Sequence, residues 1–317
     1  MADYIVARYI RAVVRHVKTW RRGTPGSSTR YPVAVALYRL VDHPDLIAPT
    51  LIAAFDGWVD SGSAATMATT RIADGGPLVA EFSADDLFDF RSRRPTLEIS
   101  DGRLAELTWP ELTLRWRRLG ERDVLVLSGV EPDFRWHEFA DAILELVERL
   151  GVESWVSLGA IPAAVPHTRP VPIMGTASRP GLLRGDVHPG PDGLLRVPAA
   201  ALSVLELAIA RSGTPAVGYF AQVPHYVSGP YPVAALALIQ AVERHLDVVI
   251  PVGELREEAH QLRTRLDAAA QSDDSTKSYV ERLESMVDEE RLPAGDELIS
   301  EIERFLRDRG NEGSARP

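Results

Sequence analysis

Acidic, hydroxyl and imidazole side chains follow several apolar runs of the chain, at the points where those runs end. If the runs are parallel β-strands, their carboxyl ends meet at one edge of a sheet, where α/β proteins collect ligands. We therefore expect these side chains to form one strand-end cluster. Its members are Asp56, Gly57, Trp58, Asp60, Ser128, Gly129, Glu131, Asp133, His167, Arg169, His225 and Tyr226.

Proton transfer is the chemistry that this cluster favours. Asp56 and Glu131 carry carboxylates, and His167 and His225 carry imidazoles, which are the groups that most often act as general acids and bases. The hypothesis requires the four side chains to share one concave pocket. Both histidines follow a proline, and a structural role is the alternative for each.

The other cluster members have structural alternatives too. Asp56 and Gly57 can form a tight turn, and Asp60 or Asp133 can cap the helix that follows it. Trp58 can lie in an interface instead of forming a stacking platform. The residue types alone leave these alternatives open.

Three arginines lie close together in the run FRSRRPTLEI. Arg91, Arg93 and Arg94 could hold a carboxylate or phosphate, because the guanidinium fork matches both groups. The alternative is a surface cluster that pairs with nearby acids. Those acids are Asp85, Asp86 and Asp89.

No complete catalytic motif accompanies these residues. Ser128 lies in LVLSGVE, which lacks the glycines of the G-x-S-x-G nucleophile elbow. Lys18 and Lys277 are the only lysines, so no phosphate loop of the G-x-x-x-x-G-K type is present. The chain has no cysteine, and its histidines lack metal-binding spacing, so we expect no metal and no cofactor.

Strand and helix patterns alternate over residues 31–251, which predicts a mostly parallel sheet covered on both faces. The runs 103–109 and 112–119 are expected to be two neighbouring meander strands. The other expected strands are 49–57, 77–83, 123–129, 152–159, 171–178 and 215–223. The expected helices are 61–72, 134–150, 198–211 and 232–245.

The two ends of the chain differ from this pattern. Residues 1–22 read as a basic amphipathic helix suited to an anionic membrane surface or a partner, with an accessory helix as the alternative. Short helices are expected near 255–269, 280–287 and 298–305. The predicted organisation is 1–30 basic helix and linker, 31–252 α/β domain, 253–309 acidic helical appendage and 310–317 disordered tail.

Several of these segments resemble a known family, the proteasome assembly chaperone 2 family in its actinobacterial branch. The matching runs are DGWVDSGSAA, DLFDFRSRRPTLEISDGR, LVLSGVEPDFRW, SLGAIPAAVPHTRPVPI and VPHYVSGPYPVAALALI. The resemblance implies a three-layer α/β/α domain similar to the nucleoside phosphorylase group, a homotrimer and a proteasome-related protein partner. Some relatives dock on the proteasome through a carboxyl-terminal hydrophobic-tyrosine motif, which the ending GSARP lacks.

The favoured function is therefore a protein-binding scaffold of the assembly chaperone kind, without catalysis. The alternative is a small-molecule-binding protein or enzyme of phosphorylase or hydrolase type that uses the strand-end cluster. A net charge of −10 argues against general nucleic-acid binding. We expect a cytoplasmic location.

Overall fold

The computed structural model describes residues 37–42, 44–185, 187–191 and 193–290. The basic helix expected at 1–22, the tail helix expected near 298–305 and the tail 310–317 lie outside the described residues. Among the residues described, no helix combines the length and the apolar composition that a bilayer crossing requires.

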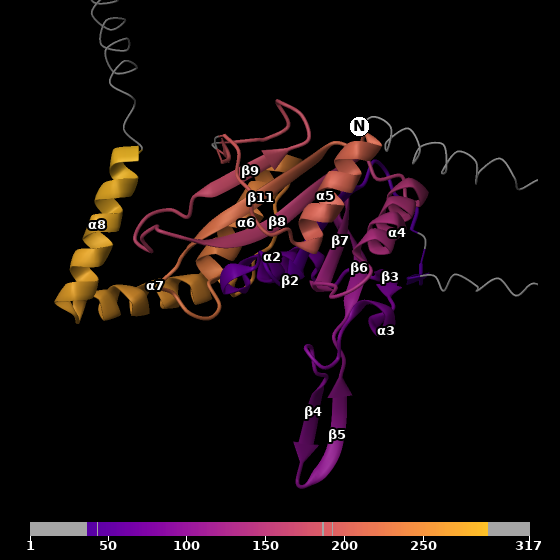
Figure 1. Cartoon of the computed structure of the whole chain (residues 1–317), viewed down its shortest axis with the longest axis horizontal. Coiled ribbons are helices and arrows are strands. Elements are labelled where there is room, and N and C mark those ends of the chain that lie inside the picture. The colour runs from indigo at the N-terminus through magenta and orange to yellow at the C-terminus, as the bar shows by residue number, and fades with distance from the viewer. Residues whose placement is uncertain (1–36, 43, 186, 192, 291–317) are drawn as a thin grey trace, which may run out of the picture. The chain divides into compact units, whose positions relative to one another are not determined.

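A nine-stranded sheet forms the centre of the fold (Figure 1). Its strands are β1 (Tyr38–Leu40), β2 (Thr50–Asp56), β3 (Leu78–Phe82), β6 (Leu112–Leu119), β7 (Arg122–Val130), β8 (Ser154–Ala163), β9 (Ile173–Ala177), β10 (His188–Pro189) and β11 (Ala216–Pro224). Their order is β1-β3-β6-β7-β2-β8-β11-β9-β10. The central strands β7, β2, β8 and β11 are parallel, whereas β1, β3, β6 and β9 pair antiparallel with their neighbours toward the centre.

Helices cover both faces of the sheet, as predicted. On one face α2 (Ala64–Ala73) packs beside α6 (Pro232–Leu246), and on the other α4 (Trp136–Arg149) packs beside α5 (Ala201–Ser212). The expected three-layer α/β/α architecture is therefore confirmed. The central strands are buried on both faces, which explains why PTLIAAFD is a continuous apolar run and not an alternating one.

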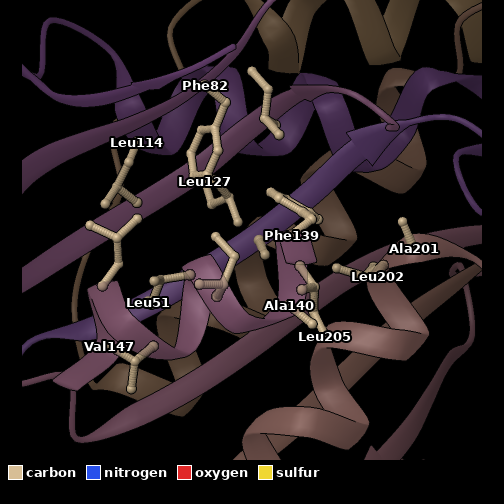
Figure 2. Close-up of a cluster of buried hydrophobic side chains, with 14 of the residues drawn as sticks. Leu51, Phe82, Leu114, Leu127, Phe139, Ala140, Val147, Ala201, Leu202 and Leu205 are labelled. Atoms are coloured by element: carbon tan, nitrogen blue, oxygen red, sulfur yellow. The ribbon is translucent and has the colours of Figure 1, made fainter. Parts of the chain in front are cut away.

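The core beneath α4 and α5 shows how the sequence builds these layers. Phe139, Ile143 and Leu146 recur at helical spacing and are buried in one cluster with Leu51 and Leu127 of the sheet. Figure 2 shows Phe139, Leu51 and Leu127 in this cluster. Each such side chain contributes about 1.5–3 kcal/mol when it leaves water. A second cluster, on the opposite face, buries the small residues of α2 against β2 and β7.

Two further helices follow the domain. Helix α7 (Leu255–Gln271) packs on α6, and α8 (Asp274–Glu290) packs on α7. They confirm the predicted helical appendage over the described part of the tail. The other helical elements among the described residues are the short η1 (Ser61–Ser63) and α3 (Ala84–Leu87).

One strand pairing differs from the prediction. β5 (Arg103–Thr108) does not lie beside β6. It pairs with β4 (Thr96–Ser100) in a separate two-stranded hairpin that stands apart from the main sheet (Figure 1). Asp101 and Gly102 both have positive φ, of 50° and 76°, as a two-residue hairpin turn of the Asp-Gly type requires. The meander prediction was wrong because strand periodicity does not specify the partner strand.

A buried carboxylate near the start of β7 gives a pH-dependent prediction. Burial alone would raise the pKa of Asp123, but three donors hold it below 3.8: the Ile47 amide, Trp116 and Arg118. The nitrogens of these donors lie between 2.6 and 3.0 Å from its oxygens. Because the pKa of Asp123 is lower in the folded state, its contribution to the free energy of unfolding is fully present above the ordinary pKa of an aspartate. That contribution is lost as pH falls through the lowered pKa.

We expect Asp123→Asn to lower the free energy of unfolding at neutral pH by about 2 kcal/mol, because charge-assisted hydrogen bonds are lost. The difference from the wild type should shrink as pH falls from the ordinary pKa of an aspartate, where the carboxyl group of the unfolded chain takes up its proton, to the lowered pKa of Asp123 in the folded protein. Urea unfolding of the wild type and the variant at a series of acidic pH values measures this difference in unfolding free energy. A difference that stays constant with pH would contradict the assignment.

Candidate functional site

A groove lies beside α2 at the carboxyl ends of β2 and β7. Its cavity volume is about 610 Å³. The side chains that matter chemically are Asp56, Thr66, Thr70, Glu111, Arg115 and Ser128. We call this feature the α2 groove.

Strand alternation explains why two predicted residues face the groove. Ala54 is buried beneath α2, so Asp56, two residues later, lies on the same face of β2. Val126 is buried there too, which places Ser128 on that face of β7. Ala54 is the register partner of Ser128, so the two strand ends lie side by side.

Gly129 is required where β6 and β7 approach each other at this edge. Its φ is 141°, and an added Cβ would lie 2.1 Å from the carbonyl oxygen of Glu111. Any side chain at this position would force the loop that carries Glu111 away. The structure therefore brings together Asp56, Ser128 and Gly129 from the predicted strand-end cluster.

Asp60 holds the start of α2. One carboxylate oxygen accepts the Ala65 amide at 2.7 Å, and the other accepts the Thr66 hydroxyl at 2.5 Å. Burial raises the pKa of Asp60, these hydrogen bonds oppose the rise, and the charge of Asp56 adds to it. These contacts match the capping alternative.

Glu131 connects two loops from a buried position. Its carboxylate accepts the amide of Trp58 at 2.9 Å and the amide of Ala201, at the start of α5, at 2.7 Å. Gly57 lies against it, and a Cβ there would come within 2.1 Å of the carboxylate. Both carboxylate oxygens of Glu131 thus accept hydrogen bonds from backbone amides. The Trp58 side chain itself is 67% exposed.

Asp133 and Arg93 form an ion pair away from the groove. The Nε of Arg93 lies 3.1 Å from one Asp133 oxygen, and the Asp89 amide donates to the other at 2.9 Å. Arg91 and Arg94 are exposed, and their side chains form no ion pair with a described residue. The three arginines therefore do not converge on one anion site.

His167, Arg169, His225 and Tyr226 lie in a different place, under the two tail helices. Arg169 donates to Asp288 of α8 at 2.7 Å and lies 3.4 Å from Glu284. Glu284 also accepts a hydrogen bond from the Thr168 hydroxyl. The backbone carbonyl of Thr168 accepts a hydrogen bond from Arg263 of α7 at 2.6 Å. We call these residues the loop–helix contact.

Three of the four ring nitrogens of the two histidines form hydrogen bonds inside this region. His225 donates from Nδ1 to the Ala163 carbonyl at 3.0 Å, and its Nε2 shares a hydrogen bond with the Tyr279 hydroxyl of α8 at 3.0 Å. The His167 amide donates to the Tyr226 oxygen at 2.8 Å, and the same oxygen shares a hydrogen bond with His167 Nδ1 at 2.7 Å.

Burial lowers the pKa of His167, and Asp267 of α7 opposes the change. Its Nε2 lies 3.3 Å from an Asp267 oxygen, without hydrogen-bond geometry. The predicted acid–base set is thus distributed over the molecule. Asp56 lines the α2 groove, Glu131 binds two backbone amides, and both histidines lie under the tail helices.

The loop–helix contact gives a prediction about local order. We expect Arg169→Ala to increase hydrogen exchange in α8 while the core strands stay protected, because Arg169 contacts two α8 carboxylates. Arg265→Ala is the matched control, since Arg265 is exposed on α7 and forms no described ion pair. Equal exchange in both variants, measured by mass spectrometry, would contradict the role of Arg169.

Sequence reasoning did not identify the rest of the groove. Thr66 and Thr70 lie one helical turn apart on α2, and Arg115 lies two residues after Thr113 on β6. The spacing of TMATT on a helix was the available signal. In the described ranges, no group of three or more histidine, aspartate or glutamate side chains could hold a metal ion.

The PAC2 family profile matches residues 54–270. A Corynebacterium glutamicum protein of unknown function is 33% identical, with a TM-score of 0.76 over 80% of this chain and 98% of its own. A PAC2 family protein from Streptomyces avermitilis is 38% identical, with a TM-score of 0.65 over 73% and 99%.

A Mycobacterium tuberculosis proteasome-assembly chaperone homologue is also similar. It is 34% identical, with a TM-score of 0.67 over 73% of this chain and 99% of its own. No curated protein matches the chain.

Proposed function

Because the chain belongs to the PAC2 family, we propose that it is a protein-binding scaffold of the assembly chaperone kind. The observation that carries the proposal is the apolar face of the β4–β5 hairpin. The groups at the strand ends support it in a second way, because most of the predicted acids bind backbone amides or an arginine.

The hairpin has one apolar and one polar face. Leu97 faces Leu107 across the two strands, and Ile99 faces Leu104. A register shift between these pairs keeps all four side chains on the same face. The four are between 45% and 74% exposed. The opposite face carries polar pairs, such as Glu98 with Glu106.

Such a hairpin gains stability from a partner. An isolated two-stranded hairpin is marginal in water, and three strands or an apolar contact are needed for stability. Neither strand makes an extensive contact with another helix or strand in the described part of the chain. Exposed apolar faces bordered by polar residues are typical of protein interaction sites.

The partner we propose is a proteasome-related protein. This rests on family membership and on the Mycobacterium tuberculosis relative described as a proteasome-assembly chaperone homologue. Self-association into a homotrimer, implied by the family resemblance, is part of the same proposal, and the hairpin can serve either contact. A catalytic role is not part of it.

Affinity purification at native expression tests the proposal. The full chain should recover a specific protein partner, and a variant in which two glycines replace residues 96–108 should lose it. Light scattering on both proteins measures self-association in the same experiment. If the full chain is a single copy and recovers no partner, the scaffold proposal fails.

A further inference from the structure

The α2 groove contains polar side chains that the fold itself does not use. Within the described residues, the carboxylates of Asp56 and Glu111 and the hydroxyls of Thr113 and Ser128 form no hydrogen bond or ion pair with another side chain or amide. Asp60 and Glu131 at the same edge are fully occupied by contrast. At this edge of the sheet, the side chains without a bonding partner therefore line the groove.

The groove presents mainly hydrogen-bond acceptors. Thr66 donates its hydroxyl proton to Asp60, and Thr70 donates to the Thr66 carbonyl at 2.8 Å, so both offer lone pairs to a ligand. Ionised carboxylates can only accept. Arg115 donates one hydrogen bond to the Gly76 carbonyl at 3.1 Å, and its other N–H groups remain available to a ligand. A ligand that fits this wall must be rich in donors.

Charge and shape restrict the ligand further. Asp56, Asp74 and Glu111 carry three negative charges and Arg115 one positive charge, so an anion is repelled. Trp109 lines the groove with an indole that is 49% exposed. The Trp109 ring packs edge-on against the Phe90 ring, with 4.8 Å between the two ring centroids, and this contact orients the indole.

We propose that the α2 groove binds a neutral polyhydroxylated molecule, a sugar or sugar-like polyol. Its hydroxyl groups would donate to Asp56, Glu111 and the threonine oxygens, Arg115 would donate to one ligand oxygen, and Trp109 would pack on a C–H face of the ring. A cavity of about 610 Å³ lies within the range of small-molecule sites. This inference goes beyond the scaffold function and does not depend on the hairpin.

A simple amine fits less well. The three carboxylates of the wall attract a cation, but they are exposed to water, where an ion pair gains little, and the Arg115 guanidinium in the same wall weakens the attraction. A polyol uses both the acceptors and the donor of the wall, as well as the indole. The test therefore includes amine and phosphate probes.

Saturation-transfer NMR on the full chain tests the proposal. The probes are methyl α-glucoside, methyl β-galactoside and maltose, with spermidine and inorganic phosphate as the competing classes. We expect saturable binding of at least one sugar, with the strongest transfer at ring C–H protons. Spermidine or phosphate binding without sugar binding would overturn the proposal, as would no binding of any probe.

Variants locate the site. Trp109→Ala and Glu111→Gln should each weaken sugar binding by about tenfold or more, because ligand hydroxyls or the ring face lose their contacts. Trp58→Ala and Asp85→Asn are the matched controls, since they remove an exposed indole and a carboxylate outside the groove. Because the Glu111 side chain has no partner in the fold, Glu111→Gln should leave the circular dichroism spectrum unchanged. Equal losses in groove and control variants would contradict the location.

Discussion

Replacement of Glu131 by alanine is expected to lower the free energy of unfolding by about 3 kcal/mol. The carboxylate is buried and binds two backbone amides, those of Trp58 and Ala201. Removing it leaves both donors without a partner in a site that water reaches poorly. The same change frees the loop after β2 from the start of α5.

Urea unfolding measures the loss, and Glu111→Ala is the control. Glu111 lies at the same edge of the sheet but is exposed and has no described hydrogen bond, so its replacement should change stability by no more than about 0.5 kcal/mol. The stability loss of Glu131→Gln should fall between those of Glu131→Ala and Glu111→Ala, because the glutamine side chain keeps one oxygen that can accept a backbone amide. If Glu131→Ala costs no more than Glu111→Ala, the proposed clamp is wrong.

Two aspartates on the apolar face of the hairpin are expected to weaken partner binding by about a hundredfold or more. Ile99 and Leu104 face each other and are the most exposed side chains of this face. The double variant Ile99→Asp with Leu104→Asp places charges where a partner would bury apolar surface. Biolayer interferometry with the copurified partner, or sedimentation if the partner is a second copy, measures the change.

The opposite face of the same hairpin supplies the matched control. Thr96 and Thr108 also face each other, so Thr96→Asp with Thr108→Asp adds the same two charges in the same kind of pair. This control should retain partner binding. Both variants should keep the unfolding free energy of the main sheet within about 0.5 kcal/mol, because the hairpin lies outside the core. Equal loss of binding in both variants would show that the apolar face is not the docking surface.

The layers of the fold could be predicted because burial leaves a direct mark on sequence. The apolar run ending at Asp56 and the helical stripe of Phe139 and Ile143 each specify an element and its buried face. The hairpin could not be assigned in the same way. Leu104 and Leu107 are three residues apart, which is not the alternation of a regular strand, and only the Asp101–Gly102 turn indicated that they pair with the strand before them.

The candidate site was predictable only in part, for a different reason. Strand topology correctly placed Asp56 and Ser128 at one edge. Whether an acid is available depends on which amides lie within its reach, and Glu131 is occupied by an amide 70 residues away in the chain. The hydrogen bonds between the tail helices and the loop carrying His167 span between 95 and 119 residues of sequence, so local patterns could not reveal the contact.

The position of β2 in the sheet also has a consequence for synthesis on the ribosome. Its two neighbours are β7 and β8, and Thr50 of β2 bonds to Ser154 of β8 across 104 residues of chain. At typical translation rates, about 5–20 s pass between the synthesis of β2 and the synthesis of β8. This buried strand therefore leaves the ribosome before one of its two partner strands has been made. Until then the edge of β2 that pairs with β8 stays open on the nascent chain, and an open strand edge is a site where chains can associate.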